Sequence, residues 1–126
     1  MYDKRLINEL FQNIEESLLL IVGQTESLSS ISDLLTTPTG ILILDGICMN
    51  LLAVGETVKS IDKYTGKELL TQYPSIPWKD VMKMRDVIAH HYFEVDAEIV
   101  FNIIRNDVPP LLAAVRQIRE DLKLNP

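Results

Sequence analysis

The segment that decides the fold spans residues 44–61 and has the sequence LDGICMNLLAVGETVKSI. Its large apolar residues recur at steps of three and four, which is the spacing of one helical face and not the alternation of a β-strand. The residues of this face are Leu44, Ile47, Leu51, Val54, Val58 and Ile61. We therefore predict a long central helix. Its small residues Gly46, Ala53 and Gly55 indicate that a second helix approaches closely.

Apolar residues with the same helical spacing lie on both sides of this segment, and no stretch shows sustained alternation. Prolines and hydroxyl-rich stretches separate the periodic segments. The predicted helices cover residues 2–26, 44–61, 77–90, 94–105 and 109–122, with a short helical turn in 29–39 and a loop with at most one turn over 63–77. We predict an all-α chain in which residues 1–126 form a single domain, a four- to five-helix up-and-down bundle.

Composition narrows the class of protein. The chain has 126 residues, of which 47% are hydrophobic and 24% are charged, and this balance excludes intrinsic disorder. A formal charge of −6 argues against a sequence-independent nucleic-acid binder, which needs a basic surface. Asp45 and Asn50 interrupt the longest apolar run, residues 40–54, and no signal peptide is recognisable, so we expect a cytoplasmic protein without a membrane span. The single cysteine, Cys48, is expected to be a buried structural thiol.

The amount of apolar surface also bears on assembly. A small bundle has difficulty burying both the face of residues 44–61 and the remaining apolar faces of its last two helices. We therefore predict a homodimer.

Residues 84–93, MRDVIAHHYF, hold the residues most suited to chemistry. They contain the pattern Arg85-x4-His90-x-Tyr92. On a continuous helix Arg85 and His90 are about 140° apart around the axis, whereas Asp86 and His90 are one turn apart. Asp86 can therefore orient the imidazole of His90 by a hydrogen bond.

Arginine and histidine together suit the cleavage of RNA. A histidine can take the proton from a ribose 2′-OH, and a guanidinium can bind the phosphate through two hydrogen bonds. Cleavage needs an acid as well as a base, and the pattern supplies one clearly placed histidine. A two-fold axis beside the motif would bring a second Arg85 and His90 into the same cleft.

Structural explanations of the same residues stay open. His90 can be a polar residue at a helix end, and Arg85 with Asp86 can be a solvated surface pair. Adjacent histidines project in different directions, so we predict neither a metal site nor a cofactor. Trp78 is expected to anchor the start of a helix. The acidic pairs Glu15-Glu16 and Glu120-Asp121 are expected to lie on solvated helix faces.

Residues 40–120 resemble the HepT toxins of the HEPN superfamily. The resemblance rests on short landmarks in a fixed order. These landmarks are Gly55-Glu56, Tyr73-Pro-x-Ile-Pro-Trp78, Met84-Arg85-Asp86, His90-x-Tyr92-Phe93, Val95-Asp96 and Ile104-x-Asn106-Asp107-x-Pro109. Two positions depart from the usual pattern: His91, where a small or acidic residue is common, and Met49-Asn50, where a more basic pair is common.

The resemblance implies a metal-independent endoribonuclease, the toxin of a type II/VII-like toxin–antitoxin system, acting as a homodimer with a composite site. Arg85 would position the phosphate, His90 would be the general acid or base, Asp86 would orient them, and His91 would be auxiliary. The implied partner is a minimal nucleotidyltransferase antitoxin that neutralises the toxin by attaching AMP to the motif tyrosine, here Tyr92. Such a group adds bulk and negative charge near the position of the RNA phosphate.

Two other functions stay open. The chain could be a non-catalytic HEPN adaptor or substrate-binding partner of a nucleotidyltransferase, or an unspecialised helical interaction domain. The distribution of charge is compatible with a local RNA site. Residues 78–93 carry three basic and two acidic side chains, whereas residues 1–77 carry five and ten.

Overall fold

The computed structural model describes residues 2–30, 32–90 and 97–124, and of Ala89, His90 and Leu124 it describes only the backbone. Within these ranges the chain forms helices and turns and no β-strand. The elements are α1 (Lys4–Thr25), α2 (Ser32–Leu35), α3 (Pro38–Tyr64), the 3-10 turn η1 (Leu70–Gln72), α4 (Trp78–His90), α5 (Ala97–Asn102), the π-helical turn η2 (Ile103–Asp107) and α6 (Val108–Leu124).

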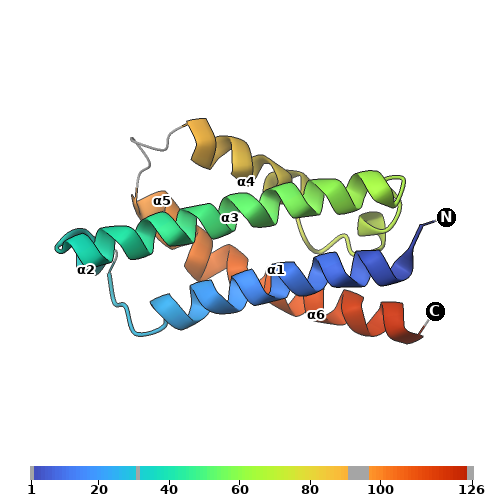
Figure 1. Ribbon diagram of the computed structural model, residues 1–126, viewed down its shortest axis with the longest axis horizontal. Helices are drawn as coiled ribbons and strands as arrows, with labels where there is room; N and C mark the ends of the chain where they lie inside the picture. Colours follow the sequence, from blue (N-terminus) through green and yellow to red (C-terminus); the bar gives the residue numbers. More distant parts are fainter. Residues whose placement is uncertain (1, 31, 91–96, 125–126) are drawn as a thin grey trace.

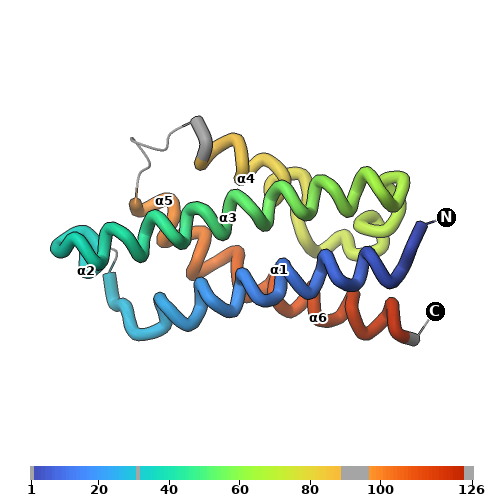
Figure 2. The backbone as a smooth tube through the Cα atoms, viewed as in Figure 1, coloured from blue at the N-terminus to red at the C-terminus, as the bar shows by residue number. Residues whose placement is uncertain are grey.

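The long helices run up and down (Figure 1). α1 leads away from the N-terminus, α3 returns, α4 runs back, and α5 with α6 returns again, so the two ends of the chain lie at the same end of the bundle (Figure 2). α1 packs against α3 and α6, and α3 packs against α4. The predicted all-α up-and-down bundle is confirmed.

The central helix has the predicted buried face but begins earlier than predicted. Ile47, Leu51 and Val58 are at most 3% exposed. The helix starts at Pro38 because Thr37 is its N-cap and accepts a hydrogen bond from the Gly40 N–H (3.0 Å). The threonines and the proline that suggested a loop are therefore the start signal of α3.

One of the two apolar surfaces on which the homodimer prediction rested is largely buried within a single chain. Of the face of residues 44–61, all members except the half-buried Leu44 are buried, so this face leaves little surface for a second copy. The most exposed apolar side chains lie elsewhere, with Leu20, Leu42 and Met49 between 60% and 70% exposed, and Ile99 of α5 is 50% exposed. The homodimer itself stays a prediction.

α3 is longer than the apolar run that the sequence suggested. Among the described residues it is the one helix with the length and mean hydropathy, 1.7, needed to cross a membrane. This is weak evidence for a span, because the core helix of a soluble protein has the same character. Here α3 packs against α1, α2 and α4.

The two predicted C-terminal helices form one nearly continuous path. α5 passes into α6 through η2, and Pro109 and Pro110 lie in the first turn of α6, where a missing N–H costs little. The irregularity therefore lies before the prolines and not at them. From η2, Arg105 donates hydrogen bonds to the carbonyl oxygens of Thr25 and Leu28 and so caps the end of α1.

The segment before α4 fixes where that helix begins. The Trp78 indole N–H donates to the Tyr73 carbonyl (2.9 Å), and the Tyr73 hydroxyl donates to Asp121 of α6 (2.6 Å). Burial, together with this hydrogen bond, raises the pKa of Tyr73 above its ordinary value. Trp78 is 8% exposed, which confirms that it anchors the helix start.

Two of the acidic residues expected on solvated faces have structural partners instead. Asp121 accepts the hydrogen bond from Tyr73, and Glu15 pairs with Arg119 at 3.1 Å between Oε1 and Nη1. Both side chains of the second pair are about one-fifth exposed (20% and 19%). These contacts join α6 to the loop before α4 and to α1.

Candidate active site

Arg85 lies in the second half of α4, where the helix touches the backbone of α3. At Gly55, a Cβ atom would lie 3.0 Å from the Val81 carbonyl oxygen and 3.2 Å from the Arg85 nitrogen. Glycine is therefore what allows α3 and α4 to meet at this level, as the sequence predicted for Gly55. The same prediction is wrong for Gly46, where an added Cβ would have no neighbour within 4 Å.

Two carboxylates hold the guanidinium of Arg85. Its Nε lies 2.6 Å from Oε1 of Glu56 on α3, and its Nη1 lies 3.1 Å from Oδ1 of Asp86 on α4. An arginine carries five N–H donors, and these contacts use Nε and one donor of Nη1. The Arg85 side chain is still 47% exposed, so a ligand can reach it.

These ion pairs position Arg85 more than they stabilise the fold. Their side chains are 46–60% exposed, and ion pairs at such exposure contribute about 0–1 kcal/mol. Gly55 fixes the backbone of α4 on α3, and the next residue, Glu56, reaches the guanidinium from the same helix. Two adjacent residues of α3 therefore determine where Arg85 stands.

The structure describes less of the other predicted site residues. His90 is the last residue of α4, and its side chain lies outside the described residues, as do His91 and Tyr92. The structure thus brings Arg85 and Asp86 together and leaves the placement of the histidine and tyrosine side chains as a prediction. Asp86 pairs with Arg85, and its predicted contact with His90 lies outside the described residues.

Glu56 is the site residue that sequence reasoning missed. It was noted as part of the landmark Gly55-Glu56, but its pairing with Arg85 joins two helices and no local spacing reveals it. The available signal was its place directly after a glycine that was expected to touch another helix.

Neither a metal set nor a reactive thiol was found among the described side chains. No three of their His, Cys, Asp or Glu side chains lie close enough together to hold a metal ion. Cys48 is 5% exposed, and burial, followed by the nearby charge of Asp45, raises its pKa. A raised pKa leaves less thiolate, so Cys48 is the structural thiol that was predicted.

Similar proteins are named as ribonucleases. The chain is 31% identical over 77 residues to a Methanocaldococcus jannaschii protein named "Putative RNase", a region covering 61% of this chain and 60% of that one. It is 33% identical over 70 residues to a "Putative RNase" of Caldanaerobacter subterraneus subsp. tengcongensis (56% and 59%). It is 30% identical over 67 residues to the "Probable ribonuclease HepT" of Thermococcus cleftensis (53% and 57%).

The match spans less than two thirds of the length of each of these relatives. No solved structure matches the chain. The model of the family described as "HepT-like: Ribonuclease HepT-like" matches residues 11–118, which include α3, α4 and the Arg85 site. The chain is therefore a member of the HepT-like ribonuclease family of the HEPN superfamily.

Proposed function

We propose that the chain is a metal-independent endoribonuclease and the toxin of a type II/VII-like toxin–antitoxin system. The observation that carries the proposal is the anchored, half-exposed guanidinium of Arg85, five positions before His90 in α4. Family membership supports a ribonuclease in general. The arginine supports a reaction at a phosphate, because its planar fork matches the phosphate oxygens.

The proposed reaction is attack by the ribose 2′-oxygen on the adjacent phosphorus. His90 takes the 2′-OH proton as a general base while Arg85 stabilises the charge that develops on the phosphate oxygens. The 2′-oxygen bonds to phosphorus, the bond from phosphorus to the 5′-oxygen breaks, and an acid gives that oxygen a proton. The products carry a 2′,3′-cyclic phosphate and a 5′-OH.

Asp86 is proposed to exchange partners during binding. It follows Arg85 directly and precedes His90 by one helical turn, so its carboxylate can serve either residue. With Glu56 and Asp86 both on Arg85, two negative charges face one positive charge, which opposes phosphate binding. If Asp86 turns to His90, it frees the Nη side of Arg85 and orients the imidazole at the same time.

The second proton carrier is proposed to come from a second copy of the chain. In a homodimer with its axis beside α4, His90 of one copy acts as the base and His90 of the other copy as the acid. His91 is an auxiliary candidate for the same role. The dimer would thus complete the site.

The test of this function is cleavage of single-stranded RNA by the purified chain in the presence of EDTA. We expect fragments with 2′,3′-cyclic phosphate ends and a loss of cleavage in His90→Ala, with the helical circular dichroism spectrum unchanged. Cleavage that disappears with EDTA, or that persists in His90→Ala, would contradict the mechanism.

Glu56→Gln is expected to lower kcat about tenfold while KM for RNA changes little or falls. The amide keeps the size of the side chain but loses the charge that holds Nε of Arg85, so the guanidinium stands in productive orientation less often. KM falls if removing one carboxylate also eases phosphate binding.

Two control variants accompany this prediction. Glu56→Asp should recover part of kcat. Glu68 is an exposed carboxylate in the loop after α3, and Glu68→Gln should match the wild type. Equal kinetics of Glu56→Gln and wild type would show that the ion pair is dispensable.

We further propose that a minimal nucleotidyltransferase antitoxin neutralises the chain by attaching AMP to Tyr92. Coexpression with a minimal nucleotidyltransferase should increase the intact mass by one or more AMP units. Tyr92→Phe should stay at its unmodified mass and should remain active when the partner is present. An unmodified wild-type chain that is nevertheless inhibited would exclude this form of control.

The adaptor function is the second candidate, because the two carboxylates around Arg85 weaken it as a phosphate ligand. This function predicts that the purified dimer does not cleave RNA and forms a stable complex with the nucleotidyltransferase. Arg85→Ala would then leave the phenotype of the cell unchanged.

A further inference from the structure

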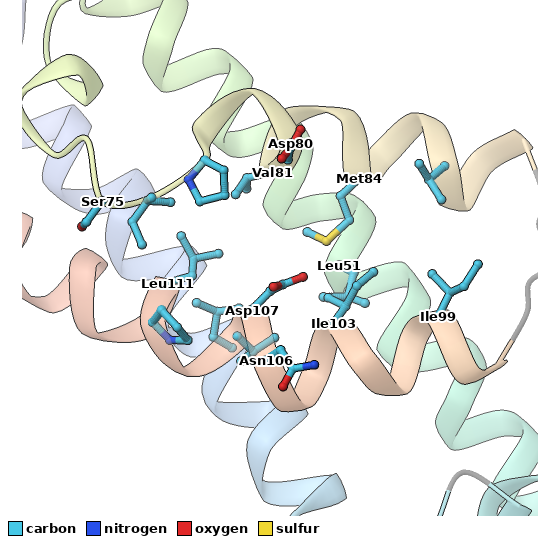
Figure 3. A pocket seen from close by; sticks show the side chains of 16 residues that line it. Leu51, Ser75, Asp80, Val81, Met84, Ile99, Ile103, Asn106, Asp107 and Leu111 are labelled. Carbon is cyan, nitrogen blue, oxygen red and sulfur yellow. The ribbon is translucent and has the colours of Figure 1, made fainter.

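A groove of about 410 Å³ opens on the flank of α4, between α4 on one side and α5, η2 and α6 on the other (Figure 3). Leu18 of α1 and Leu51 of α3 line it, and both are fully buried core residues. Its walls are mainly aliphatic: Met84 and Val87 of α4 line one side, and Ile103 of η2 lines the other. Figure 3 shows Met84 and Ile103 on opposite walls. The groove therefore reaches the core of the bundle.

The groove exists because one helix pair of the bundle does not close. α1 packs against α3 and α6, and α4 packs mainly against α3. In the described residues α4 has no comparable packing against α5 or α6. Three sides of the four-helix arrangement are thus closed, whereas on the fourth the described residues of α4 and α6 pack little against each other.

Residues of two sequence landmarks, 73–78 and 104–109, meet at this groove. Ser75 and Pro77 belong to the segment before α4, and Asn106 and Asp107 belong to η2. A π-helical turn shifts the side chains that follow it around the helix axis, and such turns are frequent at functional sites. The irregular turn places Asn106 and Asp107 on the groove.

The charged side chains at the groove, Asp80 and Asp107, are both acidic. Asp80 of α4 and Asp107 of η2 line opposite walls (Figure 3). Both are exposed, and among the described residues neither carboxylate has an ion pair or a side-chain hydrogen bond. An apolar slot between two unpaired carboxylates complements a ligand that is apolar along its centre and basic along its edges.

We propose that this groove docks an amphipathic helical segment of a partner protein, with an apolar stripe flanked by lysine or arginine. The apolar stripe would complete the open side of the bundle, as helix-in-groove ligands do. The basic residues would pair with Asp80 and Asp107. The docked helix would bridge α4, which carries Arg85 and His90, and α5–α6.

The charge of the groove favours a basic helix over two other possible ligands, RNA and a second copy of the chain. RNA would bring its phosphates towards two carboxylates, which opposes binding at this place. A second copy of the chain has a formal charge of −6, so it offers no excess of basic groups to these two carboxylates. The proposed homodimer needs its contact beside Arg85 and His90, and not at this groove. A basic segment is the occupant whose charge is complementary.

The test uses a model peptide of leucine and lysine, about four helical turns long, with leucines at i, i+3, i+4 and i+7. We expect saturable binding to the full chain, with NMR amide shifts concentrated at residues 75–87 and 99–111. Asp80→Asn combined with Asp107→Asn should weaken binding about fivefold to tenfold, because each exposed pair contributes modestly. The matched control, Asp33→Asn with Asp45→Asn, changes the net charge equally elsewhere and should bind as the wild type does.

Val87→Trp is a second variant, and it places a large side chain at a half-exposed wall of the groove. It should abolish peptide binding and leave the melting temperature within a few degrees. A peptide of the same composition without the leucine stripe should not bind. The proposal would be overturned if the peptide without the leucine stripe bound equally well, or if the Asp80/Asp107 double variant bound the peptide as tightly as the wild type. It would also be overturned if the NMR amide shifts lay elsewhere on the chain, or if RNA or a second copy bound preferentially at the groove.

Discussion

Arg85→Ala is expected to reduce the rate of RNA cleavage about 100- to 1,000-fold, the usual cost of removing a donor that stabilises transition-state charge. We expect a small effect on stability, because the substitution removes only the exposed ion pairs to Glu56 and Asp86. Cleavage of RNA by the purified variant and its melting temperature measure the two effects separately.

Arg85→Lys distinguishes charge from geometry. Lysine keeps the positive charge but cannot donate to Glu56 and to a phosphate through one planar fork. We expect it to recover no more than about a tenth of the wild-type rate. If both variants cleaved RNA at the wild-type rate, Arg85 would not be part of the active site. Unfolding of Arg85→Ala would show instead that the ion pairs support the α3–α4 contact more than their exposure indicates.

The fold was largely predictable because its strongest signal is periodic. The face of residues 44–61 specified a helix, and the structure buries that face. The predicted helix boundaries were wrong where residue types typical of loops belong to a helix. Thr37 and Pro38 look like a loop but form the cap and first turn of α3. The break expected between residues 105 and 109 is a π-helical turn that keeps the path helical.

The site was predictable only in its local part. Arg85 and Asp86 are neighbours in the sequence, and the structure confirms their contact. The pairing of Glu56 with Arg85 depends on how far apart α3 and α4 lie and in which rotation, which a single sequence does not specify. The groove could not be predicted from the sequence either, because it forms where α4 packs little against α6.

Gly55→Leu is expected to destabilise the fold by about 3 kcal/mol and to lower RNA cleavage as well, since overpacked sites cost about 1–3 kcal/mol or more. A Cβ at Gly55 already falls within 3.2 Å of two backbone atoms of α4, and backbone cannot move aside as a flexible side chain can. The larger side chain must push α4 off α3. Arg85 would then move away from Glu56, which stays on α3.

Gly46→Leu is the matched control in the same helix. Nothing lies within 4 Å of a Cβ at Gly46, so the gain in helix propensity over glycine, about 0.5–1 kcal/mol, should appear as a small stabilisation. Chemical denaturation of both variants measures the difference. If Gly55→Leu does not fold, Gly55→Ala is the milder form, in which the propensity gain and the contact with α4 oppose each other. Equal stability of the Gly55 and Gly46 variants would mean that α4 is free to shift on α3, and Arg85 would then owe its position to Glu56 alone.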